Sequence, residues 1–150
     1  MLHHFFFRST VLSAVFLLMS PALPNDVVRV FILSGQSNMV GAGDVPAAAD
    51  RNEGKGSLEW LTEAPASAPH YKHLRNDDGT WVARDDVQIW FLDRKGPLQP
   101  GYGSTPNKIG PELGFGWTIG DAFEEPVLLI KIAWGGKSLS EDFRPPSLQG

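Results

Sequence analysis

Three apolar runs, separated by long polar and glycine-rich stretches, organise the chain after its first 25 residues. Residues 26–33 are nearly continuous in Val, Ile and Phe, a pattern typical of a strand buried in a parallel sheet. Residues 86–93 and 126–134 have the same character, and the last run is the strongest. The pattern therefore predicts three strands. The stretches 44–69 and 94–109, rich in Gly and Pro, are expected to be long loops.

A helix is predicted to begin at Pro111. Proline suits the first position of a helix, and Glu112 suits its first turn. The apolar period that follows fits either a strand or a helix, and the cap signal favours the helix. A shorter helix is expected near 57–63, and Asp78-Gly79 indicates a turn. The order strand, strand, helix, strand predicts an α/β fold, a three-layer α/β/α sandwich around a mainly parallel sheet.

Composition and charge exclude several classes of function. The 150 residues carry a formal net charge of −4 and show no basic stripe, so nucleic acid is not an expected partner. The sequence contains no cysteine, which excludes a disulfide framework, a thiolate metal site and a cysteine nucleophile. Neither composition nor charge indicates an oligomeric state.

The first 22 residues resemble a secretory signal peptide. Arg8 precedes an apolar stretch at 11–19, and the small residues Ser20 and Ala22 follow it. A membrane anchor is the alternative, but the apolar stretch is shorter than the roughly 20 residues that span a bilayer. We therefore expect a secreted or periplasmic protein that leaves the membrane after cleavage near Ala22, with its domain at 23–150.

Ser37 stands directly after the first predicted strand, where the sheet presents its carboxyl edge. Sites in such sheets form at the carboxyl ends of strands, so residues 34–38, 101–110 and 135–140 are expected to converge. Position alone favours a helix-capping role for Ser37 over a nucleophile. The G-x-S-x-G elbow is not present, since Met39 occupies the second glycine position.

Three blocks in order change this interpretation. The sequence GQSNM at 35–39 resembles the first motif of the SGNH hydrolases, in the form found in the sialate O-acetylesterase-like branch, which includes carbohydrate esterase family six acetylxylan esterases. Residues 108–116 and 131–139 resemble the second and third blocks. The resemblance implies that Ser37 is the nucleophile of a carbohydrate O-acetylesterase, with an acetylated carbohydrate as its substrate. It implies an oxyanion hole of the Ser37 and Gly110 backbone N–H groups with the Gln36 side chain. It implies no metal and no organic cofactor.

The sequence departs from this family pattern at two points. The third block has no asparagine, so the side-chain donor to the oxyanion could be Gln36, Asn38 or Asn107. No Asp-x-x-His follows Ser37, and His70 and His73 are expected to be solvated loop residues. The resemblance therefore implies the N-terminal part of an esterase domain, without its acid–base pair.

The alternative is a non-catalytic carbohydrate-binding or interaction module derived from the esterase fold. Such a module would need exposed aromatic rings on which sugars stack. The candidates are Trp60, Trp81, Trp90 and Trp134.

Overall fold

The computed structural model describes residues 27–138 and 140–148. The predicted signal peptide and its cleavage site lie outside the described residues. The elements, in chain order, are β1 (Arg29–Gly35), α1 (Ser37–Val40), β2 (Gly43–Asp44), η1 (Asn52–Gly54), α2 (Leu58–Glu63), α3 (Ala68–Tyr71), η2 (Lys72–Leu74), β3 (Arg84–Phe91), β4 (Arg94–Leu98), β5 (Lys108–Ile109), α4 (Pro111–Ala122), β6 (Val127–Ala133) and η3 (Pro146–Leu148).

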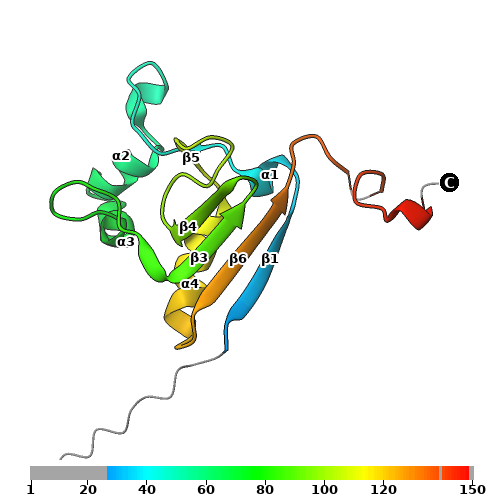
Figure 1. Ribbon diagram of the computed structural model, residues 1–150. Helices are drawn as coiled ribbons and strands as arrows, with labels where there is room; N and C mark the ends of the chain where they lie inside the picture. Colours follow the sequence, from blue (N-terminus) through cyan, green and yellow to red (C-terminus); the bar gives the residue numbers. More distant parts are fainter. Residues whose placement is uncertain (1–26, 139, 149–150) are drawn as a thin grey trace, which may run out of the picture.

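The main sheet has the strand order β1-β6-β3-β4 (Figure 1). β6 pairs in parallel with β1 on one side and with β3 on the other, and β4 is antiparallel to β3. A short antiparallel pair joins β2 to β5. The predicted α/β class with a mainly parallel sheet is confirmed. Gly35 at the end of β1 pairs with Ala133 at the end of β6, so both strands reach the same edge.

Helix α4 covers one face of the main sheet. Phe31 of β1 meets Phe115 of α4 edge to face, with ring centroids 5.5 Å apart. Gly116 and Gly120 let the helix approach closely, because a Cβ at Gly116 would lie 2.3 Å from Leu98 Cδ2. The fully buried side chains lie mainly on the strands beneath this helix: Val87, Ile89, Phe91, Leu98, Val127 and Leu129.

The opposite face of the sheet is apolar and exposed. Ile32 of β1, Ile130 of β6 and Trp90 of β3 stand side by side in the strand register. Ile32 is 64% exposed and Trp90 is 54% exposed. Among the described residues, helices therefore pack on one face of the sheet only, so two of the three predicted layers are present in these ranges. Within the same ranges, no helix is both long and apolar enough to cross a membrane.

The structure corrects the loop predicted at 94–109, which contains β4 and β5. β4 follows β3 through a two-residue turn in which Leu92 has a positive φ of 55°. Leu-Asp is not a typical hairpin turn sequence, so the pattern gave no hairpin signal. Pro97 within β4 is tolerated because this strand lies at the edge of the sheet. The helices predicted from Pro111 and near 57–63 are present as α4 and α2.

The close packing of α4 predicts opposite effects at two of its glycines. Gly116→Val would force a side chain into Leu98 and Leu129, and we expect it to lower the free energy of unfolding by about 1–3 kcal/mol. Gly114→Ala has open space around it and should raise stability by up to about 1 kcal/mol through helix propensity. Urea denaturation measures both, and equal effects would contradict this account of the packing.

Candidate active site

Ser37 lies at the carboxyl end of β1 and begins the short helix α1. The Gln36 carbonyl accepts the N–H groups of Met39 and Val40 at 2.9 Å each, which folds the chain back immediately after the strand. Gly35 is required at this turn because a Cβ there would lie 2.8 Å from Met39 Cβ. The Ser37 side chain is exposed, and its hydroxyl makes no hydrogen bond to any described residue. The turn thus presents a free hydroxyl at the edge of the sheet.

Two backbone segments meet immediately after this helix. Gly41 has a φ of +85°, and a Cβ at this position would lie 2.2 Å from the Cα of Gly110. The Gly41 carbonyl accepts the N–H of Ser104 at 2.9 Å. The predicted convergence of 34–38 with 101–110 is therefore observed. Residues 135–138 also leave from this edge, since the Trp134 N–H donates to the Gly35 carbonyl at 3.3 Å, but the chain then runs away from the sheet (Figure 1).

A buried ion pair lies beneath the meeting point. Lys131 Nζ of β6 and Glu112 Oε2 of α4 are 2.6 Å apart, and their side chains are 0% and 1% exposed. Lys131 also donates to the carbonyls of Val40 and Tyr102, at 2.7 and 2.8 Å. Its ammonium lies 4.5 Å from the centroid of the Phe91 ring. Burial lowers the pKa of Lys131 below its usual value, while the Glu112 carboxylate opposes that shift.

Glu112 also determines where the Gly110 N–H points. This N–H was predicted to donate to an oxyanion, and in the structure it donates to Glu112 Oε1 at 2.7 Å. A bound oxyanion would have to share it or displace the carboxylate. From the sequence, Glu112 was expected only in the first turn of a helix, and Lys131 had no predicted role. A lone lysine within the run VLLIKIA was the available signal, because a buried ammonium requires partners.

The amides proposed as the third oxyanion donor are all exposed. Gln36 and Asn38 flank Ser37 directly, and neither side chain is hydrogen-bonded to another described residue. Asn107 lies in the loop before β5, where its carbonyl accepts the Val45 N–H at 3.0 Å. Gln36 and Asn38 therefore lie beside Ser37 in the chain, and both have side-chain amides without a hydrogen bond to another described residue.

Comparison with known families identifies the chain. Residues 27–149 match the family described as carbohydrate esterase, sialic acid-specific acetylesterase. The chain belongs to this family. The match includes Ser37, Gly110 and the Lys131–Glu112 pair, and it supports the sialate O-acetylesterase-like resemblance of the three sequence blocks.

Two further comparisons add less. A solved structure of a protein from Arabidopsis thaliana is similar over 75% of this chain, at 20% sequence identity and a TM-score of 0.45. The chain spans 43% of the length of that structure. Comparison with curated protein sequences gives no match.

His70 and His73 of this esterase-family chain lie on the wall of an apolar hollow of about 360 Å³ beside α4. Gly110 and Trp117 line the same hollow, whereas Ser37 does not. The His73 and Trp117 rings are edge to face, with centroids 4.8 Å apart. Both histidines are exposed, as expected, and neither is bonded to Ser37, but they lie in the short helices α3 and η2 and not in a loop. Within the described ranges, no cluster of three or more His, Asp or Glu residues could bind a metal ion.

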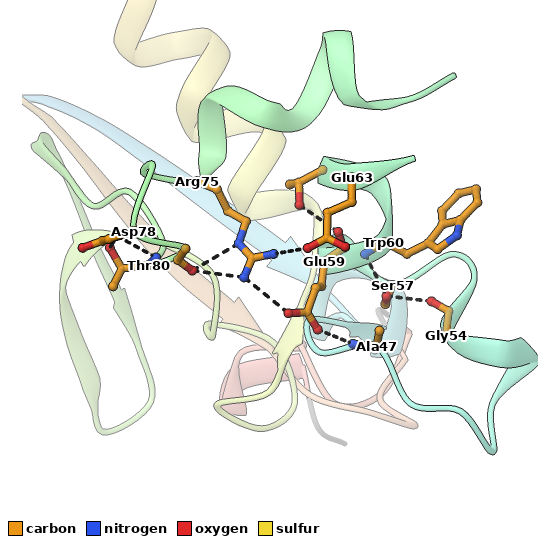
Figure 2. A network of polar contacts seen from close by, with 11 residues as sticks. Ala47, Gly54, Ser57, Glu59, Trp60, Glu63, Arg75, Asp78 and Thr80 are labelled. Atoms are coloured by element: carbon orange, nitrogen blue, oxygen red, sulfur yellow. Dashed lines mark hydrogen bonds and ion pairs between the residues drawn. The ribbon is translucent and has the colours of Figure 1, made fainter. Parts of the chain in front are cut away.

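Arg75 directly follows the segment that carries the two histidines and forms ion pairs with α2. Its guanidinium lies between the carboxylates of Glu59 and Glu63 on α2, at 3.3 and 2.9 Å (Figure 2). It also donates to the Gly79 carbonyl through two nitrogens, at 3.2 and 3.1 Å. Gly79 is in the predicted turn and has a φ of +83°. Arg75 therefore fastens the turn at 76–80 to α2, next to the segment that carries the histidines.

The four candidate sugar-stacking tryptophans differ in exposure. Trp60 and Trp81 are half-buried, and the Arg75 guanidinium lies 5.0 Å from the Trp81 ring. Trp90 is 54% exposed on the open sheet face, and Trp134 is 45% exposed beyond β6. Neither of the exposed rings lines the hollow beside α4.

Gly41→Ala tests the close approach of the two site segments. A methyl group would collide with the Gly110 backbone, so we expect a loss of more than about 3 kcal/mol in the free energy of unfolding. Gly136→Ala is the control, because Gly136 also has a positive φ, of +72°, but open space around it. The control should cost no more than about 1–2 kcal/mol. If chemical denaturation shows equal losses in the free energy of unfolding for both variants, the positive φ alone explains the cost, and the collision with Gly110 does not contribute.

Arg75→Lys should loosen the turn at 76–80, because an ammonium cannot replace the planar fork that spans two carboxylates and a carbonyl. We expect a stability loss of about 1 kcal/mol and faster hydrogen exchange at the Val82 amide, which donates to the Leu74 carbonyl. Exposed Lys72→Arg is the control and should change neither. Unaltered exchange in Arg75→Lys would contradict the fastening role.

Proposed function

We propose that this chain carries the nucleophile of a serine esterase that removes O-acetyl groups from carbohydrates, such as acetylated sialic acids or acetylated xylan. The observation that supports it is the exposed Ser37 hydroxyl, free of partners among the described residues, at the carboxyl edge of the sheet in a chain of the carbohydrate esterase family. Assignment to the carbohydrate esterase family six branch is part of the same proposal.

In the proposed reaction, Ser37 Oγ attacks the carbonyl carbon of the acetyl ester while its proton passes to a general base. The tetrahedral intermediate collapses, and the sugar oxygen leaves with that proton. Water then attacks the acetyl group on Ser37 and loses a proton to the same base. Acetate departs and the serine is regenerated.

The oxyanion is proposed to be held by backbone N–H groups of Ser37 and Gly110 and by the Gln36 amide. The Ser37 N–H is in the first turn of α1, where helical N–H groups have no partner in the helix. The Gly110 N–H is available only if Glu112 Oε1 shares or yields it. Donors directed at the developing charge are a large contribution to ester hydrolysis.

The general base is proposed to lie outside these 150 residues. No Asp-x-x-His follows Ser37, and His70 and His73 are not bonded to it. We propose that the chain is the N-terminal part of a longer esterase domain whose remainder supplies the histidine and its carboxylate. We also propose that residues 1–22 direct export and are then removed.

The decisive experiment uses the chain joined to the rest of its coding sequence and an aryl acetate as the substrate. Ser37→Ala should reduce kcat/KM by about 10³-fold or more, since it removes the nucleophile. Ser34→Ala is the control: Ser34 is an exposed serine of β1, the strand that precedes Ser37, and this variant should retain full activity. Unchanged hydrolysis in Ser37→Ala would overturn the assignment. Acetate release from acetylated glycans then identifies the substrate.

A further inference from the structure

A single buried side chain connects the segments that carry the proposed esterase site. Lys131 donates to the Val40 carbonyl at the end of α1, to the Tyr102 carbonyl in the loop before β5, and to Glu112 in α4. A lysine ammonium has three N–H donors, so all of them are used. The side chain is fully buried, and water cannot replace any of these partners.

Glu112 extends this connection to the second site segment. One of its carboxylate oxygens pairs with Lys131, and the other accepts the Gly110 N–H at 2.7 Å. An uninterrupted chain of polar contacts therefore runs from Val40, in the helix that Ser37 begins, to Gly110. The Lys131–Val40 bond joins residues that are 91 positions apart in the sequence, and the Lys131–Glu112 bond joins residues that are 19 positions apart.

We propose that Lys131 and Glu112 are positioning residues that hold Ser37 and the Gly110 N–H in register for catalysis, an inference that rests on the proposed function. Neither segment holds itself in place. Helix α1 has four residues, too few to be stable alone. Gly41 and Gly110 lack side chains to anchor the backbone that follows. The ion pair fixes both segments to β6, the central strand beside β1.

A role in positioning is separable from a role in stability. Replacing both members of a buried ion pair by apolar residues of similar volume often leaves stability unchanged. Removing only one member leaves a buried charge without a partner and is strongly destabilising. The double variant Lys131→Met with Glu112→Met would remove the charges together. It would still leave Val40, Tyr102 and Gly110 without the partners that orient them.

The experiment compares Lys131→Met, the double variant and a core control, all in the chain joined to the rest of its coding sequence. Leu129→Ala is the control, because Leu129 is a fully buried residue of the same strand without a polar role. Aryl acetate kinetics are measured at a temperature where circular dichroism shows every variant folded. We expect kcat to fall about tenfold or more in both Lys131 variants, with KM changed less than about twofold.

The double variant should recover at least half of the Tm lost by Lys131→Met without recovering kcat. Leu129→Ala should lower Tm and keep kcat. Recovery of kcat together with Tm in the double variant, or an equal loss of kcat in Leu129→Ala, would overturn the positioning role and leave a purely structural one.

Hydrogen exchange gives a readout that does not require activity. The Gly41 and Gly110 amides should exchange about tenfold faster or more in the double variant, because the Lys131–Val40 and Glu112–Gly110 hydrogen bonds that hold these segments are gone. The β3–β6 amides should be unchanged. If only the Gly41 and Gly110 amides exchange faster but the protein has no esterase activity, the proposed function is wrong while the role of Lys131 and Glu112 in holding the two segments is supported. If the protein is an active esterase but the double variant does not exchange faster at Gly41 and Gly110 than at the β3–β6 amides, only the role of Lys131 and Glu112 in holding the two segments is overturned.

Discussion

The structure depends on how a single charge is accommodated in the middle of a buried strand. The Lys131 ammonium has no access to water, so neutralisation and hydrogen bonds must come from protein groups. Its neighbours in the sheet are apolar and cannot supply them. The partners come instead from α1, from the loop at 101–103 and from the first turn of α4, which all have to reach the same point. This requirement fixes the ends of two helices over the carboxyl edge of the sheet.

Glycines make that convergence sterically feasible. Gly35 lets α1 turn back beside β1, and Gly41 and Gly110 bring two backbones into contact. A side chain at any of the three would meet an atom closer than normal contact distance. Gly116 has the corresponding role in the α4–sheet interface. The candidate site is therefore built from backbone segments held by one ion pair, and Ser37 is exposed on top of them.

Much of this arrangement was predictable, and the exceptions have physical causes. The continuous apolar runs identified β1, β3 and β6, and the Pro111 cap identified α4. Strand β4 was missed because its turn uses Leu92 at positive φ and its interior contains Pro97. The apolar run at 26–33 placed Ser37 directly after a strand, and the resemblance of the three sequence blocks made it the predicted nucleophile. The bond that occupies the Gly110 N–H was not predictable, since it depends on which way the Glu112 carboxylate points.

The sequence by itself determined the fold class, the strand that presents Ser37 and the family of the chain, because local periodicity, caps and short motifs encode each of them. The tertiary structure decided that β6 lies between β1 and β3, that Lys131 and Glu112 face each other, and that His70 and His73 line a hollow apart from Ser37. These features are contacts between residues far apart in the chain. Their geometry is set by packing and charge neutralisation, which no local pattern records.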